Sequence, residues 1–525
     1  MQRGHLGTAV IMTMLVLWLA AEGNSKQKSY PPEVIKVLKA SGQNHKQLEK
    51  VLSFYASEGD SFKLHAALFL IGNMEGHSYV TYGLYDTLGN EIKFNPLDYS
   101  DYDALRSAWD TLETQYGVID FKKKDMVYDL QTIKADFITQ NIDYAFKAWR
   151  EKPWAKGLSF ETFCDYVLAY RGSNEPLENW REFFYQKYQN IEKRMSDPSD
   201  AIEAAGLINN DIKSWFSFDP RFYYHPTDQG LSEMLKNKMG RCEDMTNVTI
   251  YAMRAGGIPI TSDYTPYWAN TGNNHMWNAI VTPDGRAIPF MGAEANPGEY
   301  HLANKLAKVY RKTFDKQTQN LIFQKRKQEK IPDWLSGKSY KDVTADYEEV
   351  CNATVALRQE IPDSIDIAYL CVFNDGEWKP IHWARIENNR AEFTDMGRDI
   401  LYLPALYINA KIAPFGQPLI LHTDCTTQEI FSEAQETITL ELTSNVPSKQ
   451  EFLPDGSAKV LLTSGQEYEL FYWKDGWQSV GKQVAKDKPL VFKEVPAGCL
   501  YWLVAKGSDK EERIFTVENG KQIWW

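Results

Sequence analysis

The spacing of hydrophobic residues divides this chain into regions of different secondary structure. From about Pro31 to Met195, apolar residues recur at intervals of three and four, which is typical of helices packed on a core. The positions that carry this pattern are Ile35, Leu38, Leu48, Val51, Leu52, Val127, Leu130, Ile133, Phe137, Ile138 and Ile142. We therefore predict a helical region over residues 24–196. Asp197-Pro198-Ser199-Asp200 then breaks the pattern and begins a new helix, which indicates a domain boundary.

Beyond Trp334 the pattern changes to short alternating strands separated by turn residues. An internal repeat with an offset of 99 residues runs through this part: Tyr369, Phe373, Trp378, Phe393, Leu401 and Tyr402 recur as Tyr468, Tyr472, Trp477, Phe492, Leu500 and Tyr501. A repeat of this length matches a β-sandwich domain. We predict two antiparallel β-sandwiches, at residues 340–440 and 441–525. The basic segment Lys308–Lys330 is predicted to be a helical connector.

The first residues have the features of a signal peptide. Arg3 supplies a positive charge, Thr8–Ala20 is apolar but short for a membrane span, and Ala21-Glu22-Gly23 offers small residues for cleavage. We therefore expect residues 1–23 to be removed and the chain to be exported, periplasmic or extracellular, without a membrane anchor. The remaining residues predict a multidomain α+β protein, with a mixed core at 197–325 between the helical and β regions.

Charge and cysteine content narrow the function classes. The chain has 58 Lys and Arg against 70 Asp and Glu, a net charge of −12, which argues against nucleic acid as a partner. Its six cysteines are too widely spaced for a disulfide scaffold, although the four C-terminal ones could form one or two bridges. Aromatic residues make up 13% of the chain. We attribute this excess to β cores, with carbohydrate contact through the β-sandwiches as the alternative.

A cysteine stands at the start of a predicted helix. Gly240-Arg241-Cys242-Glu243-Asp244 precedes a helical run that Gly256-Gly257 ends. A cysteine in this position is more often structural than catalytic. The amides and dipole of a helix N-terminus nevertheless favour a thiolate, so we expect a lowered pKa for Cys242.

A histidine follows 33 residues after Cys242. His275 begins an alternating strand that runs to Val281, turns at Thr282–Arg286 and returns as Ala287–Phe290. A histidine within reach of a helix-borne thiol can form the imidazolium partner of a Cys–His nucleophile pair. Alone, His275 is more simply a structural residue, but together with Cys242 it predicts nucleophilic catalysis.

The combination Gly240-x-Cys242-x-Asp244, Arg254-Ala255-Gly256-Gly257-Ile258-Pro259 and His275-x-Trp277 resembles the transglutaminase-like superfamily of papain-fold cysteine enzymes. That superfamily includes transglutaminases, peptide N-glycanases and bacterial cysteine peptidases. The resemblance covers about 100 residues and implies Cys242 as nucleophile and His275 as base. The helical N-terminal part and the Trp524-Trp525 end are similar to exported bacterial members, from which no substrate carries over.

The third catalytic position departs from the superfamily pattern. Members usually place an aspartate about sixteen residues after the histidine, where this chain has Met291. Methionine cannot orient an imidazole or stabilise its charge. Glu294 is the nearest carboxylate and becomes our candidate, with Asn296 as the alternative orienting residue. A degenerate, inactive protein is a further alternative.

Aromatic residues between Cys242 and His275 are candidates for a substrate cleft. We assign Tyr267 and Trp268 to its wall, together with Trp277, although ordinary packing explains them equally well. No P-loop, dinucleotide fingerprint, zinc spacing or EF-hand loop occurs, so we expect no cofactor and no metal.

These observations predict a cysteine-dependent acyl-transfer enzyme acting on amide bonds of a peptide, protein or glycopeptide. Cys242 would form a thioester while His275 acts as acid and base. Hydrolysis by a peptidase or amidase is our first prediction, with transglutaminase or peptide N-glycanase-like activity as an alternative. The contrasting prediction is an inactive homologue that binds peptide or glycan.

Overall fold

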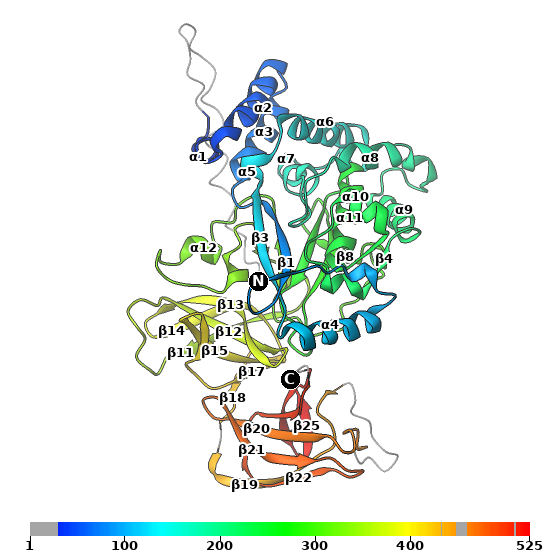
Figure 1. Cartoon of the computed structure of the whole chain (residues 1–525). Helices are drawn as coiled ribbons and strands as arrows, with labels where there is room; N and C mark the ends of the chain where they lie inside the picture. The colour runs from blue at the N-terminus through cyan, green and yellow to red at the C-terminus, as the bar shows by residue number, and fades with distance from the viewer. Residues whose placement is uncertain (1–29, 432, 448–458, 509–510) are drawn as a thin grey trace.

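The computed structural model describes residues 30–431, 433–447, 459–508 and 511–525 (Figure 1). The predicted signal peptide lies outside these residues. Within them, no helix has the length and apolar character needed to cross a membrane.

The N-terminal part is built mainly from helices that share one hydrophobic core with the central region. Its helices are α1 (Pro32–Ala40), α2 (His45–Glu58), α3 (Ser61–Asn73), α4 (Tyr102–Tyr116), α5 (Asp129–Thr132), α6 (Ala135–Glu151), α7 (Phe160–Phe163) and α8 (Trp180–Lys187). Local signals set their ends: Asp60, for example, caps α3 by accepting hydrogen bonds from the amides of Phe62 and Lys63. The helical prediction holds for most of this part.

One three-stranded sheet interrupts these helices, so the predicted helical region is not helical throughout. It has the order β2 (Glu91–Ile92), β1 (Ser78–Tyr85) and β3 (Asp120–Tyr128). Val127, expected on a helix, lies in β3 opposite Tyr79. The long antiparallel ladder between β1 and β3 fixes this backbone, and a local hydrophobic period cannot report such a partner.

The central region combines helices with a five-stranded sheet of order β10-β9-β6-β7-β8. Its elements are α9 (Ala201–Lys213), α10 (Leu231–Asn237), α11 (Cys242–Ala255), β6 (Ile260–Thr265), β7 (His275–Val281), β8 (Ala287–Phe290), β9 (Tyr310–Lys312) and β10 (Tyr340–Asp342), with a small pair β4 (Ser217–Phe218) and β5 (Met239–Gly240). Helix α11 is almost wholly buried, and Asn278 on β7 donates to the Thr246 carbonyl of α11. The predicted helix and the predicted β7–β8 hairpin are both confirmed.

The prediction of a helical connector over Lys308–Lys330 was wrong. This segment contains strand β9 and only a short helix, α12 (Leu321–Gln324). Lys308, the first residue of this basic segment, is buried, and its ammonium donates to Asp342 and to the carbonyls of Thr394 and Asp395. Tertiary partners therefore hold this segment as an extended chain between the core and the β region.

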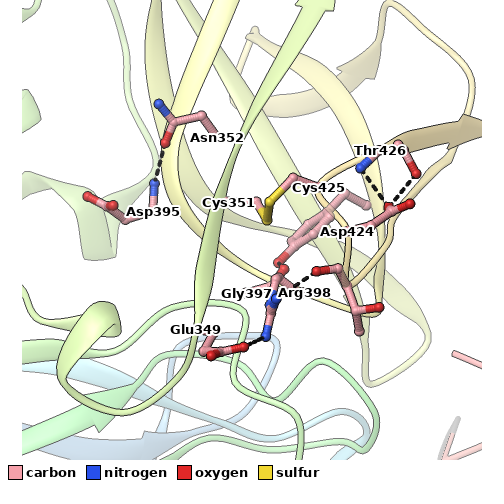
Figure 2. The surroundings of a disulfide bond; sticks show 11 residues. Glu349, Cys351, Asn352, Asp395, Gly397, Arg398, Asp424, Cys425 and Thr426 are labelled. Carbon is pink, nitrogen blue, oxygen red and sulfur yellow. Dashed lines mark hydrogen bonds and ion pairs between the residues drawn. A yellow bond between two sulfur atoms is a disulfide. The ribbon is translucent and has the colours of Figure 1, made fainter. Parts of the chain in front are cut away.

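The first β unit, residues 350–429, is one continuous antiparallel sheet, so the prediction of a two-sheet sandwich here was wrong. The strand order is β11 (Val350–Ala356), β14 (Arg390–Gly397), β13 (Glu377–Glu387), β12 (Ile367–Asn374), β15 (Ile400–Ile408), β17 (Leu419–Leu421) and β18 (Thr427–Glu429), with β16 (Lys411–Pro414) also on β15. A disulfide joins Cys351 on β11 to Cys425 beside β18 (Figure 2). Because these lie at opposite ends of the strand order, the disulfide closes the sheet into a near-barrel.

The described residues of the second β unit, 433–447, 459–508 and 511–525, form two sheets. One pairs β19 (Glu433–Leu442) with β22 (Leu490–Ala497), and the other has the order β21 (Trp477–Val484), β20 (Glu467–Trp473), β23 (Tyr501–Ala505), β24 (Ile514–Glu518) and β25 (Lys521–Trp524). Side chains of both sheets share one core that includes Leu440, Leu470 and Phe515. This arrangement agrees with the predicted sandwich.

The structure confirms the internal repeat. The hydroxyl of Tyr402 donates to the carbonyl of Gly397, and the hydroxyl of Tyr501, 99 residues later, donates to the carbonyl of Pro496. The two units meet through aromatic residues, three of which belong to the repeat: Trp378 contacts Trp473, and Phe373 contacts Trp477. These tryptophans are used to pack one β unit against the other. Part of the high aromatic content is therefore explained by this interface and does not require a ligand. Carbohydrate contact through the β units stays a prediction.

Candidate active site

The sequence around Cys242 fixes where helix α11 begins. Asp244 accepts a hydrogen bond from the amide of Arg241 at 3.0 Å and another from the amide of Gln229 at 2.9 Å. A Cβ atom at Gly240 would lie 2.5 Å from the Asp244 side chain, so only glycine fits there. Glycine, cysteine and aspartate at this spacing therefore place Cys242 in the first turn of the helix.

The Arg254-Ala255-Gly256-Gly257 run anchors the other end of α11. Gly257 has φ +75°, a left-handed conformation suited to glycine, and lies against the backbone of Ala148. Arg254 is buried and donates to the carbonyls of Tyr166, Ile260, Ala169 and Arg171. These bonds hold the helix rigidly in the core, so the position of Cys242 is set from both ends of α11.

The Cys242 thiol is buried beside a carboxylate. Its side chain is 7% exposed, and its sulfur donates to the carboxylate of Glu243 at 3.1 Å. Burial raises the pKa of Cys242, and the negative charge of Glu243 raises it further; Arg241 and the amide of Met276 oppose this shift. The expected lowering of the Cys242 pKa by the helix end was therefore wrong, because desolvation and the neighbouring carboxylate outweigh it.

His275 stands at the start of β7, next to the residue whose amide reaches the Cys242 sulfur. Its Nε2 atom lies 2.6 Å from the hydroxyl of Tyr300. Burial lowers the pKa of His275, and it also raises the pKa of Tyr300, helped by the charges of Glu294 and Cys242. A neutral phenol thus holds the ring nitrogen that an orienting carboxylate or amide would occupy in the predicted triad.

Neither predicted orienting residue contacts His275 within the described part of the chain. Glu294 is exposed, and its charge acts on Tyr300 rather than through a bond to the imidazole. The Asn296 amide is engaged by α9, accepting from Asn209 at 3.0 Å and donating to Asn210 at 3.1 Å. Met291 is 2% exposed and belongs to the hydrophobic core. The structure therefore brings Tyr300 to His275 in their place.

The three predicted cleft residues have different surroundings. Trp268 stacks beside the His275 ring with 5.9 Å between centroids, and Tyr267 is half-buried against Trp334. Trp277 is completely buried and donates to the hydroxyl of Tyr347, so it supports the histidine strand from within the core and forms no cleft wall.

The loop that carries Trp268, residues 266–274, is held by the first β unit. Asn374 donates from one amide group to the carbonyls of Trp268, Thr271 and Asn273, at 2.9–3.1 Å. Buried Arg513, from the second unit, donates to the Ala269 carbonyl of the same loop. The β units therefore contribute to the surroundings of His275.

The transglutaminase-like superfamily model matches residues 189–290, which contain both Cys242 and His275. This segment is a transglutaminase-like superfamily domain. A search of curated proteins found no match to the chain. The matched segment ends one residue before Met291, so Tyr300 lies outside the transglutaminase-like domain model.

Sequence reasoning missed Tyr300, Glu243 and Asn374. Glu243 was visible beside Cys242, and its acidic character was a signal against a thiolate. Tyr300 and Asn374 follow the histidine by 25 and 99 residues without a motif around them. The described residues hold no group of His, Cys, Asp and Glu suited to a metal ion.

Proposed function

We propose that this chain is an exported cysteine-dependent hydrolase that cleaves amide bonds in peptides or proteins. The observation that carries the proposal is the meeting of Cys242, at the first turn of α11, with the His275 strand, where the Met276 amide reaches the sulfur. The transglutaminase-like domain supports cysteine-dependent amide chemistry in general.

In the proposed mechanism, His275 removes the thiol proton with Nδ1, because Nε2 is engaged by Tyr300. The thiolate attacks the amide carbonyl carbon, and His275 returns the proton to the nitrogen as the C–N bond breaks. The acyl group remains on sulfur as a thioester. Water, deprotonated by His275, then attacks the thioester and releases the acid and the thiol.

Tyr300 is the proposed positioning residue in this cycle. When the phenol oxygen accepts the Nε2 hydrogen, the lone pair of the neutral ring lies on Nδ1, as a general base requires. A phenol is a weaker stabiliser of imidazolium than a carboxylate. We therefore expect a low turnover number. Tyr300 would contribute mainly by fixing the orientation of the imidazole, and less by stabilising the charge of the imidazolium.

Activity measurements test this proposal directly. We expect the mature protein to hydrolyse members of a peptide and amide library, and Cys242→Ala and His275→Ala to abolish that turnover without loss of fold. Cys164→Ala is the matched control, because Cys164 is also buried but lies outside this site. Turnover that survives Cys242→Ala would contradict the mechanism.

Replacing Tyr300 separates this assignment from the alternatives. Tyr300→Phe should lower kcat by about tenfold to a hundredfold, because the imidazole loses its only described hydrogen bond. Glu294→Gln should change kcat less than Tyr300→Phe, since its charge reaches the site only through the phenol. The reverse order of effects would restore Glu294 as the orienting carboxylate.

The pH dependence of thiol alkylation follows from the shifted pKa values. Because the pKa of Cys242 is raised, its thiolate is scarce at neutral pH, so iodoacetamide labelling should be slow there and accelerate only above pH 9. Glu243→Gln keeps the size of the side chain and removes the charge that raises this pKa. We expect labelling of that variant to accelerate at lower pH. Rapid labelling of the unsubstituted protein at pH 6–7 would instead indicate a thiolate–imidazolium pair.

The second candidate function is an inactive homologue that binds peptide. The raised pKa of Cys242 and the phenol in place of a carboxylate favour it. Peptide binding that is unchanged in Cys242→Ala, with no turnover of any substrate, would support this function over hydrolysis.

The proposed function includes export of the chain from the cytoplasm. The Cys351–Cys425 disulfide supports it, because such bonds persist in oxidising compartments. Fractionation of the natural host should recover a shortened chain outside the cytoplasm. A full-length cytoplasmic chain with both cysteines reduced would contradict export.

A further inference from the structure

A cavity of about 340 Å³ lies where the helical part, the central sheet and the connector meet. Four cationic side chains contribute to its lining, and none of its lining residues is acidic. The cations are Arg171, Arg254, Lys312 and Lys338, and the aromatic residues Tyr264 and Trp334 form part of the wall. The lining of this cavity is therefore positively charged, although the whole chain has a net charge of −12.

Three of the four cations already have partners in the protein. Arg171 forms an ion pair with Asp129, Arg254 donates to backbone carbonyls, and Lys338 donates to Glu75 at 3.0 Å. The Lys312 ammonium, in contrast, makes no hydrogen bond or ion pair with any described residue. Lys312 is half-buried, so its ammonium has lost part of its water without gaining a hydrogen-bond partner. A ligand that supplies an anion would therefore be stabilised here.

Lys312 links this cavity to the candidate active site. It follows Arg311, which pairs with Asp263 across β9 and β6, in the same sheet as the His275 strand. Asp263 on β6 also pairs with Trp277 on β7, two residues from His275, so Lys312 and the His275 strand are separated by a single strand. Burial lowers the pKa of Lys312, and the negative charges of Asp228, Glu243 and Glu175 oppose this shift.

We propose that this cavity receives a carboxylate of the amide substrate, which pairs with the Lys312 ammonium. This inference rests on the proposed hydrolase function and narrows its substrate to peptides with a carboxylate near the cleaved bond. The volume suits the end of a short peptide. The carboxylate has two chemical sources, the α-carboxyl group of a chain end or an acidic side chain.

The test uses the full-length mature protein with Cys242→Ala, so that binding is measured without turnover. Calorimetry would compare acetyl-Ala-Ala with its amide, and acetyl-Ala-Glu-amide with acetyl-Ala-Gln-amide. We expect a carboxylate form to bind about tenfold or more tightly than its neutral counterpart. A preference in the first pair identifies a chain end, and one in the second pair identifies an acidic side chain.

Adding Lys312→Met should abolish the preference, whereas Lys312→Arg should retain part of it. Lys316→Met is the matched control, because Lys316 lies outside the lining and already pairs with Glu75. Lys312→Met should melt no lower than its parent, since it removes an unpaired charge. Equal binding of charged and neutral peptides, no binding of either, or a preference that survives Lys312→Met would each overturn the proposal.

Lack of turnover in the unsubstituted protein, with the Lys312-dependent preference intact, would instead reject only the hydrolase.

Discussion

The two β units repeat one strand order but close differently. In the first unit, Asn388 and Asn389 take left-handed conformations in a tight turn, and β13 continues into β14 through the pair Ile386 and Ala391. In the second unit the corresponding stretch is Ala485–Pro489, and the described residues show no pairing of β21 with β22. One unit is therefore a continuous near-barrel and the other a two-sheet sandwich. The tight turn keeps β13 and β14 paired, and the disulfide joins the two ends of the resulting sheet.

The equivalent hairpin tips also contact different parts of the molecule. In the first unit, Asn374 and Asp375 bind the loop that carries Trp268. In the second unit, Asp475 accepts a hydrogen bond from Gln417 of the first unit. The same hairpin therefore occurs in both units, and among the described residues the first copy is the one that holds the loop beside His275.

The largest expected effect concerns the disulfide, which the second unit does not share. Replacing Cys351 and Cys425 with alanine opens a closed loop with a sequence separation of 74 residues. Chain entropy predicts a loss of about 4 kcal/mol in the free energy of unfolding. Hydrogen exchange should detect this as lost protection in β11, β17 and β18.

Strands of the second unit serve as the internal control for that experiment. Protection in β20 and β23 should change little, because the disulfide does not constrain them. Equal loss in both units would mean that they unfold together, contrary to the independent closure inferred here.

Asn374→Ala should have the next largest effect. It removes the amide that donates to three loop carbonyls, of which the Asn273 carbonyl keeps one other donor, the Trp268 amide, so Trp268 and His275 lose their fixed alignment. We expect kcat/KM to fall by about a hundredfold, as for other small displacements of catalytic groups. Asp475→Ala, at the equivalent hairpin, should leave kcat/KM unchanged. Similar losses from both substitutions would show that the hairpins have equivalent roles.

The smallest effect tests what the two units share. Tyr402→Phe and Tyr501→Phe each remove one buried hydrogen bond from a corresponding tyrosine. Each should cost about 1 kcal/mol in denaturant unfolding. Unequal losses, with one substitution silent, would mean that only one unit depends on this contact.

The sequence alone determined the elements that depend on local signals. Gly240, Asp244 and Gly257 set the ends of α11, and the alternation after His275 set strand β7. The 99-residue repeat likewise predicted corresponding strands in both β units, because each copy carries its own turns and aromatic positions. Steric limits and hydrophobic period act between near neighbours, so they can be read without a fold.

Only the tertiary structure decided which distant groups meet. The hydroxyl of Tyr300, and not the predicted Glu294, contacts His275. Asn374 binds the loop that carries Trp268, and the disulfide closes the first β unit. The Cys242 pKa moved opposite to the helix-based expectation, because burial by surrounding segments and the Glu243 carboxylate outweigh the helix end. Such outcomes depend on desolvation and on contacts between residues far apart in the chain, which no local pattern encodes.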